Sequence, residues 1–377
     1  MYQTYYHNQL QRTEFRLESN HVYNSDMRLV DVQAGSDGTY QYGAGAYALI
    51  KNIYLYDDNI LIDQCYEAGY IASLENMLNE NRRNRDLWSY SVKSSIGYTN
   101  VANPVNNASV VDSLTALQTG KGNVASRLEL RPLLGFLAFN QLFQLKMPRL
   151  VIEWNTSAHD VFILADSAKI ITIPAPTLIV DDLIGAPNVP MPQSYLSYEL
   201  DRITQPAVVT NVIKKTKFRV NGFDKKRVGR LLLINKGDYN AVMGDYKSHA
   251  QWYEEIQLYV NDSPFLPSPI TRFNKQSYMN DAYGNMNFPI GLNYVAFEAG
   301  DGTANSDLLH DVNIKQYEHT QSWGVVDFKD QIIPDLQVEY TRGGGTLGVN
   351  ASVMLLIGEV ARQLSKDANG NAVVAND

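Results

Sequence analysis

Histidine, cysteine and carboxylate side chains could do chemistry in this chain, but their spacing argues against a shared site. The histidines are never closer than nine residues, so the His-x-His pair of a cupin-type metal site does not occur. The six positions are His7, His21, His159, His249, His310 and His319. Cys65 is the only cysteine, which excludes an intrachain disulfide and a cysteine-based metal site. We therefore expect isolated surface or loop histidines, no metal ion and no cofactor.

Two glutamates and one glycine-rich segment come nearest to a catalytic pattern. Glu153 and Glu339 could form the pair of a glycan-cleaving site, which needs two carboxylates roughly 5–10 Å apart across a cleft. They occupy equivalent positions in an internal repeat, so ordinary strand positions in separate modules are the favoured interpretation. Residues 343–348, GGGTLG, fit G-x-G-x-x-G, but a strand-like run follows them in place of a pyrophosphate-binding helix. No G-x-S-x-G elbow or Walker A motif occurs, and we predict that the chain is not an enzyme.

A run of basic residues is the strongest charge feature. Between positions 214 and 230, eight of 17 residues are basic, in a chain whose net charge is -8. They are Lys214, Lys215, Lys217, Arg219, Lys225, Lys226, Arg227 and Arg230. Such a concentration could contact nucleic-acid phosphates or anionic lipid headgroups. The favoured interpretation is a solvated strand-and-turn face, or salt bridges to neighbouring subunits.

Composition indicates an all-β protein of two domains. The chain has 377 residues, of which 45% are apolar and 19% charged, so it can bury a sizeable core. Its 24 tyrosines, 25 glycines and 14 prolines favour strands joined by many turns. The N-terminus lacks the apolar segment of a secretory signal, and no run reaches the ~18 apolar residues of a membrane span. We expect a soluble protein that is made in the cytosol and not secreted.

Periodicity divides the chain into segments. Residues 1–24 are polar and aperiodic and are predicted to form an arm. The run YALIKNIYLYDDNILID predicts a strand–turn–strand around Asp57, Asp58 and Asn59. A helix is expected over roughly 64–81, where apolar residues recur at spacings of three to five, and RLELRPLLGFLAF predicts a strand leading into a short helix. Two long polar stretches, 96–126 and 264–321, are expected to be loops.

A cluster of proline and glycine at 185–192 marks the boundary between the two halves. A linker is predicted at 184–204, with a short helix in QSYLSYELDRI. The first module then covers 25–183 and the second 205–365, and residues 366–377 are expected to be a disordered tail.

Two pairs of segments recur in the same order in both halves. Ile53–Tyr56 corresponds to Ile256–Tyr259, and each is followed by an Asp/Asn turn. Pro148–Trp154 and Pro334–Tyr340 share the pattern P-x-L-x-[IV]-E-[WY]. The offsets are 203 and 186 residues, a difference that variation in loop length readily accommodates. One such pair could arise by chance in any β protein, but both pairs in order indicate a duplicated β-sandwich of about 170 residues.

The sequence resembles the double jelly-roll major capsid proteins of double-stranded DNA viruses, over about residues 26–360. The likeness is to the polinton-like virus and virophage branch of the adenovirus-hexon-like lineage. The stretches that carry it are, in order, ALIKNIYLYDDNILIDQCYEAGYIASLENML, RLELRPLLGFLAFNQLFQLKMPRLVIEW, KIITIPAPTLIVDD, VGRLLLINKGD and EEIQLYVNDSPF. The resemblance implies an all-β chain of two tandem eight-stranded jelly rolls, with a few short helices in connecting loops.

The function that this resemblance implies is structural. Three copies would form a homotrimeric capsomer of pseudohexagonal outline in an icosahedral shell, in contact with neighbouring capsomers, penton proteins and minor or cement proteins. The long loops would form the outer surface, and the 1–24 arm would cross to a neighbour. The expected location is the virion. In such a shell, the less favoured interpretation of the 214–230 run, a phosphate contact, would place it on the inner face against viral DNA or an internal membrane. A β-sandwich protein that binds a receptor or a glycan is the alternative.

Overall fold

A computed structural model describes the strand framework of the chain. The described residues are 4–7, 11–32, 41–42, 47, 49–69, 71, 126–138, 142–156, 162–163, 175–183, 189–191, 193–205, 214–236, 253, 255–271, 274, 277–278, 281–282, 323–342 and 352–376. The glycine-rich segment 343–348 and almost all of the predicted loops at 96–126 and 264–321 lie outside these ranges.

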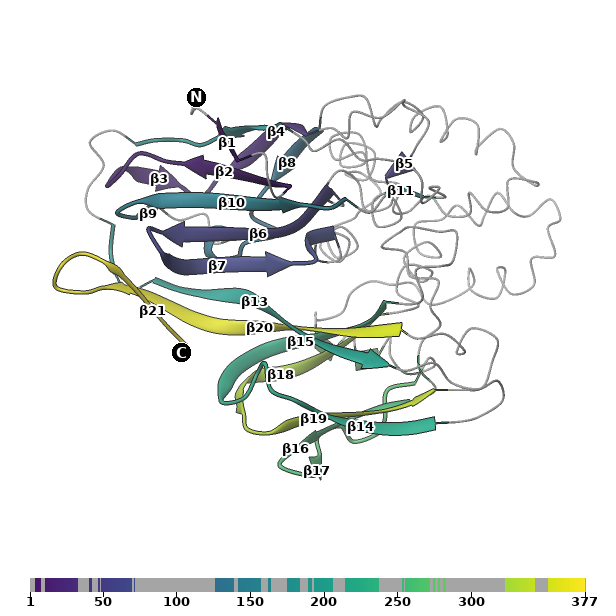
Figure 1. Cartoon of the computed structure of the whole chain (residues 1–377). Helices are drawn as coiled ribbons and strands as arrows, with labels where there is room; N and C mark the ends of the chain where they lie inside the picture. Colours follow the sequence, from purple (N-terminus) through teal and green to yellow (C-terminus); the bar gives the residue numbers. More distant parts are fainter. Residues whose placement is uncertain are drawn as a thin grey trace.

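The C-terminal half forms a sandwich of two sheets (Figure 1). Their strand orders are β13-β20-β15-β18 and β14-β19-β16-β17. Lettered B to I in chain order, these eight strands give the sheets B-I-D-G and C-H-E-F, which is the arrangement of a jelly roll. The bounds are β13 Gln193–Gln205, β14 Lys214–Val220, β15 Lys226–Lys236, β16 Glu255–Val260, β17 Ser263–Pro264, β18 Trp323–Ile333, β19 Leu336–Arg342 and β20 Ser352–Lys366.

The N-terminal half repeats this arrangement. Its larger sheet has the order β1-β2-β10-β6-β7, in which the last four strands take the C, H, E and F positions. Across the core, β12, β4 and β8 take the I, D and G positions, and the short pair β3–β9 continues the D–G pairing. The bounds are β1 Thr4–His7, β2 Arg12–Arg16, β3 Val22–Asn24, β4 Arg28–Val32, β5 Gln41–Tyr42, β6 Ile50–Asp57, β7 Ile60–Tyr66, β8 Ser126–Glu129, β9 Leu142–Gln144, β10 Pro148–Trp154, β11 Phe162–Ile163 and β12 Thr177–Ile179. Among the described residues of this module, no strand takes the B position.

The recurring sequence segments occupy equivalent strands. Ile53–Tyr56 lies in β6 and Ile256–Tyr259 in β16, and each of these E strands pairs antiparallel with an H strand, β10 or β19. The register differs by two residues, because Ile152 pairs with Ile53 whereas Val338 pairs with Leu258. An even slip leaves the same side chains pointing inward, so both hairpins keep their apolar residues in a core.

The B-I-D-G sheet of the second module is buried on both faces. Leu231 and Leu233 of β15 join the core of the second sandwich. Leu232 and Ile234, on the opposite face, join a cluster that includes the core of the first sandwich, and Leu355 and Ile357 of β20 do the same. A strand covered on both faces can carry a continuous apolar run, which accounts for RLLLIN and VMLLIG. The two modules therefore share one hydrophobic cluster.

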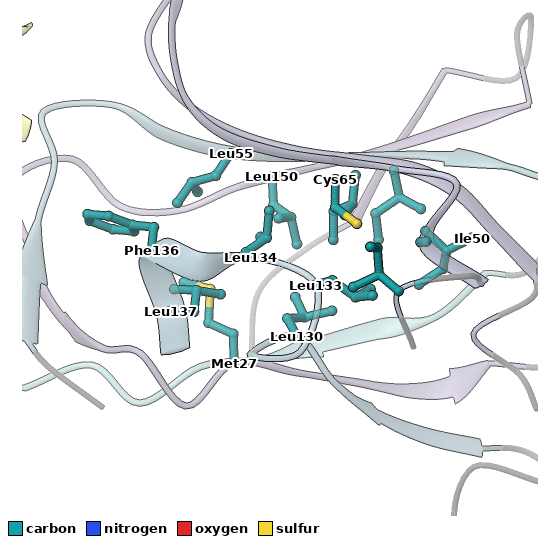
Figure 2. Close-up of a cluster of buried hydrophobic side chains, with 14 of the residues drawn as sticks. Met27, Ile50, Leu55, Cys65, Leu130, Leu133, Leu134, Phe136, Leu137 and Leu150 are labelled. Atoms are coloured by element: carbon teal, nitrogen blue, oxygen red, sulfur yellow. The ribbon is translucent and has the colours of Figure 1, made fainter. Parts of the chain in front are cut away.

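A short helix fills the centre of the first sandwich. α4 (Gly135–Ala138) follows β8, as the sequence predicts. The phenylalanine and leucine side chains within the helix, and the leucines just before it, are all fully buried. Figure 2 shows the helix between Leu55 and Leu150 on one side and Met27 on the other. A Cβ atom at Gly135 would lie 1.6 Å from the carbonyl oxygen of Leu196 in β13. Only glycine allows α4 to approach the second module this closely.

The predicted arm is wrong, because most of residues 1–24 belong to the first sandwich. Thr13, Phe15 and Leu17 are buried at alternate positions, and β2 pairs with β10. Arginine and glutamate side chains at the intervening positions made the segment look aperiodic.

The predicted helix at 64–81 begins too early. Gln64 and Cys65 continue strand β7, where they pair with Tyr54 and Ile53 of β6. The first helical residue is Ala68, and the rest of the predicted helix after Ile71 lies outside the described residues.

The short helix predicted in the linker is also wrong, because Gln193–Gln205 is strand β13, paired along its whole length with β20. Leu196, Leu200 and Ile203 have helical spacing, but the buried residues alternate with period two and several of them are polar. The pairing with a strand 147 to 171 residues away in sequence, which local periodicity does not encode, decides the conformation.

The predicted disordered tail forms a hairpin. β21 (Ala372–Asn376) pairs with the end of β20, and Asp367 Oδ1 accepts hydrogen bonds of 2.8 Å from the backbone N–H groups of Asn369 and Asn371. Ala372 is buried in the shared cluster, and Lys146 of the first module donates to Asn371 at 2.9 Å. The small polar residues that suggested disorder form the turn of this hairpin.

Candidate functional site

The structure divides the eight basic residues between the two sheets of the second sandwich. Four lie on β14 in the C-H-E-F sheet, three lie on β15 in the B-I-D-G sheet, and one lies in the turn between them. In chain order these groups are Lys214, Lys215, Lys217 and Arg219; then Lys225 in the turn; then Lys226, Arg227 and Arg230. The run therefore does not form one continuous patch.

Three basic side chains of β14 pair with acids on the neighbouring strand β19 and in the E–F and G–H turns. The pairs are Lys215 with Glu339 at 2.9 Å, Lys217 with Asp262 at 3.7 Å and Arg219 with Asp335 at 2.7 Å. The hydrogen bond to Glu339 raises the pKa of Lys215. Lys217 also lies 4.0 Å above the centre of the Tyr259 ring. These pairs offset most of the positive charge on this strand.

Two basic side chains of β15 neutralise buried carboxylates. Lys226 Nζ donates to Glu199, and to the carbonyl oxygen of Gly222 at 2.8 Å. Arg230 makes a bidentate contact with Glu359, with distances of 2.6 and 2.7 Å. Burial raises the pKa of Glu359, and the guanidinium opposes that shift. Removing either cation would take a partner from a buried carboxylate, and the pairing leaves little charge for an external partner.

Lys225 and Arg227 are the exposed basic residues at the C–D turn. Lys225 has a positive φ of 59° in this turn. Arg227 pairs across the sheet with Ile332, whose side chain is 58% exposed. Among the described side chains of the basic run, Lys225 and Arg227 are thus the exposed cations outside the ion pairs given above, and they lie beside an exposed apolar side chain.

A buried polar cluster connects the two modules, and sequence reasoning missed it. Asp63 of β7 accepts hydrogen bonds from Ser197 Oγ of β13 at 2.6 Å and from the backbone N–H of Phe136 at 2.8 Å. The carboxyl group is fully buried, and this burial raises the pKa of Asp63 to about 6. Three hydrogen bonds, the third from the N–H of Gln64, partly oppose this shift. One carboxyl group therefore holds α4, β7 and β13 together.

Glu199 of β13 is the second centre of this junction. It accepts a hydrogen bond from Arg362 at 2.8 Å and another from Lys226, so two strands of the same sheet supply its cations. Nearby, Arg202 of β13 donates to Glu67 of the first module at 2.8 Å. The alternating pattern of QSYLSYELDRI could have indicated this junction. If the segment is a strand, its buried face carries polar side chains, and these require hydrogen-bond partners from another element.

One group of three neighbouring side chains could in principle bind a metal ion: Glu18, His21 and Asp182. His21 Nδ1 lies 2.7 Å from Asp182 Oδ2, and Nε2 lies 3.2 Å from Glu18 Oε2. The carboxylates approach opposite ring nitrogens, so both contact the imidazole ring and do not converge on one ion. The hydrogen bond to Asp182 raises the pKa of His21. His21 is therefore an ion-paired residue and not an isolated one; the side chains of the other five histidines lie outside the described part.

Glu153 and Glu339 lie on H strands in different modules, and each contacts a tyrosine of the neighbouring E strand. Tyr54 donates to Glu153 at 3.1 Å, and Tyr259 donates to Glu339 at 3.0 Å. The same Glu–Tyr contact thus recurs across both E–H pairings. This agrees with ordinary strand positions and not with a shared pair across one cleft.

The short turns of each module gather at one end of its sandwich, which we call the turn end. In the first module, the C–D, E–F and G–H turns line a hollow of about 350 Å³ that includes Arg16, Ser19, Asn59 and Met147. In the second module, the backbone N–H of Lys225 donates to the carbonyl oxygen of Ile333 at 2.9 Å, which joins the C–D and G–H turns. Lys225 and Arg227 therefore lie at the turn end.

Comparison with known proteins identifies this architecture. No protein-family model matches the chain, and no curated protein matches its sequence. Among solved structures, it is similar to the mavirus major capsid protein, with a TM-score of 0.56 and 10% identity over 100% of this chain and 90% of that one. It is also similar to VP54 of PBCV-1, as fitted into a reconstruction of the virophage Sputnik, with a TM-score of 0.53 and 10% identity over 100% and 95% of the two chains. The chain has the double jelly-roll fold.

A chain from the structure of the Sputnik virophage shows the same double jelly roll. The TM-score is 0.50, with 11% identity over 100% of this chain and 88% of that one. The predicted fold class, an all-β chain of two tandem jelly rolls, is confirmed. Among the described residues of this double jelly roll, no helix has the length and apolar character that crossing a bilayer requires.

Proposed function

We propose that this protein is the major capsid protein of an icosahedral double-stranded DNA virus and acts as a structural component, not as an enzyme. The observation that carries the proposal is the jelly-roll strand order built twice in one chain, together with the likeness of its whole length to viral capsid structures. Two similar sandwiches per chain place six around the axis of a trimer. Such a trimer has a nearly hexagonal outline and can tile a closed shell with similar contacts on every side.

The oligomeric state and the assemblies of the purified protein test this proposal. We expect a stable homotrimer of about three times 42.4 kDa by light scattering, and hexagonal plates or shells by negative-stain microscopy. A persistent monomer with affinity for glycans would support the alternative, a β-sandwich receptor- or glycan-binding protein. A hydrolase activity that a point mutation abolishes would contradict both.

A role as a capsid protein implies further partners in the assembled particle. Besides neighbouring capsomers, a shell of this type needs penton proteins at its vertices and minor or cement proteins at its joints, and the protein is then a component of the virion. We further propose that the turn end faces the particle interior, where Lys225 and Arg227 contact phosphate groups of the viral DNA or of membrane lipids. The support is their exposure beside Ile332, in contrast to the five basic side chains of the run that pair with acids.

Charge reversal at the turn end tests this contact. The Lys225→Glu/Arg227→Glu variant should lose most of its binding to double-stranded DNA or to anionic vesicles, and the probe that the wild type binds identifies the source of the phosphate. Lys215→Glu is the matched control, because Lys215 is paired with Glu339 on the outer face of the other sheet. Equal losses in both variants, or none in either, would contradict a specific role for the turn end.

A further inference from the structure

The C strands of the two sandwiches carry the same short sequence pattern. Residues 12–17, which form β2 and the position after it, read RTEFRL, and residues 215–220 of β14 read KTKFRV. The offset is 203 residues, the same as between the repeated segments of the two E strands. β2 and β14 can therefore be compared residue by residue. Thr13 corresponds to Thr216, and Phe15 corresponds to Phe218.

An additional strand covers the C strand in the first module. β1 pairs antiparallel with β2, so that Thr4 lies opposite Phe15 and Tyr6 opposite Thr13 (Figure 1). In the second module the sheet order begins at β14 itself, and among the described residues β19 is the only strand that pairs with it. Within this part of the chain, the far side of β14 is thus an open edge, to which a further strand can add through backbone hydrogen bonds.

The side chains on the inner face of the two C strands differ in the same way. Thr13 and Phe15, on the strand that β1 covers, are 1% and 0% exposed. Phe218 is only partly buried against the second core. The hydroxyl of Thr13 accepts a hydrogen bond of 2.7 Å from the Trp154 indole, whereas Thr216 Oγ1 is shielded from solvent without a hydrogen-bond partner in the described structure. A strand added to β14 would extend the sheet beside these two residues.

The charges on the outer face of β14 favour an acidic strand. Lys215, Lys217 and Arg219 alternate along it, and all three are exposed. Glu339, the partner of Lys215, lies on β19, on the opposite side of β14 from the open edge. An added strand would therefore lie directly beside the cations. Cross-strand neighbours of opposite charge stabilise a sheet and like charges destabilise it, so β14 of a second copy is disfavoured as the partner.

We infer that β14 binds an extended segment of another protein, in which acidic residues alternate with apolar or hydroxyl-bearing ones, as a further antiparallel strand of the C-H-E-F sheet. The acidic side chains lie beside the cations of the outer face. An apolar side chain lies beside Phe218, and a hydrogen-bonding one lies beside Thr216. The first module provides the precedent, because a strand in this position is already part of its sheet. The inference adds a partner site to the proposed capsid role and does not depend on that role.

A synthetic peptide with this pattern tests the inference. In the register of β1 on β2, the sequence acetyl-Thr-Glu-Val-Glu-Thr-Glu-amide places one glutamate beside each of the three cations. We expect the labelled peptide to bind the full chain in a fluorescence-anisotropy titration and to slow amide hydrogen exchange in residues 214–220. Two control peptides should not bind. One is methylated at its backbone nitrogens, which keeps the charge and removes the donors, and the other has lysine in place of glutamate.

A matched pair of variants separates the open edge from general charge attraction. Lys215→Gln/Arg219→Gln should weaken binding of the acidic peptide by about tenfold. Arg12→Gln/Arg16→Gln makes the same change at the equivalent positions of β2, whose edge is paired with β1, and should leave the affinity unchanged. Circular dichroism must show native strand content in both variants.

Four results would overturn the inference. They are no binding of the acidic peptide by the wild type, equal binding of the methylated peptide, equal losses of affinity in the two variants, and protection from exchange that lies outside residues 214–220. The exchange measurement needs no substitution, so it decides the location of the peptide even if a variant unfolds.

Discussion

At the scale of single residues, Asp63 links the stability of the protein to pH. Burial raises its pKa from 3.8 in a free side chain to about 6 in the folded protein. Between these two values the folded state binds more protons than the unfolded state, so the contribution of Asp63 to stability falls as the pH rises towards 6 and is constant above it. Two pKa units correspond to a loss on the order of 2–3 kcal/mol.

Asp63→Asn should remove this part of the pH dependence. Chemical denaturation at several pH values between 4 and 7.5 measures the free energy of unfolding, and the variant should show a flatter profile than the wild type. Its absolute stability should also drop. The amide nitrogen replaces one of the two oxygens that accept from Ser197 and from the backbone N–H of Phe136, so one of these hydrogen bonds is lost. Asp58→Asn is the matched control, because Asp58 is an exposed turn residue and asparagine tolerates its positive φ of 54°. Profiles with equal slopes for wild type and Asp63→Asn would show that Asp63 is not the titrating group.

At the scale of secondary-structure elements, α4 shows packing overriding helix propensity. Gly135→Ala should stabilise an isolated helix by up to about 1 kcal/mol. In this fold the new Cβ would lie 1.6 Å from the carbonyl oxygen of Leu196, and backbone cannot move away as a side chain can. We expect a net destabilisation of about 3 kcal/mol or more, measured by denaturant unfolding.

Gly222→Ala is a control for this substitution, because its nearest contact is the Asp201 side chain at 3.2 Å. It should cost under ~1 kcal/mol, since a side chain can shift by a few tenths of an ångström. Similar stabilities for Gly135→Ala and the wild type would mean that α4 and β13 are not in close contact.

The C-terminal hairpin is an element that stabilises both modules. Removing residues 367–377 deletes β21, which pairs with the end of β20, and breaks the contact of Lys146 with Asn371. The expected loss is about 1–2 kcal/mol, because few large side chains are uncovered. The melting temperature measures this loss, and removal of Asp377 alone is the control. A truncated protein as stable as the full chain would show that the hairpin does not dock on the first module.

At the scale of the whole molecule, the shared hydrophobic cluster predicts cooperative unfolding. Leu232, Ile234, Leu355 and Ile357 of the second module are buried in the same cluster as the core of the first. Unfolding one module would expose this face of the other. Calorimetry should therefore show one transition, with a calorimetric enthalpy equal to the van't Hoff enthalpy. Two resolved transitions would show that the modules are independent.

The duplicated hairpins were predictable from the sequence because the residues that determine the turn and the pairing lie close together in the chain. Asp58 and Asn59 form a turn between two β-rich runs, so the pairing of β6 with β7 needs only neighbouring residues. β4 shows the limit of such patterns. Simple alternation along this strand would bury Asp31. A bulge at Asp31, where φ is 63°, instead turns Val32 to the buried side.

The candidate site was only partly predictable. The basic run is visible in the sequence, but its division between two sheets depends on which strand pairs with β14 and which with β15. The polar junction was not visible, because Ser197 and Glu199 resemble surface residues until Asp63 and Arg362 are placed beside them.

The sequence by itself determined the all-β class, the duplication, the main hairpins and the lack of a recognisable catalytic motif. Each of these depends on residue type and on spacing along a short stretch. Only the tertiary structure decided that Gln193–Gln205 is a strand, that the tail forms a hairpin and that the basic run is mostly paired. The physical reason is that a strand acquires its neighbours across the sheet, from residues far away in the chain, and a polar residue can be buried only where such a neighbour supplies its partner.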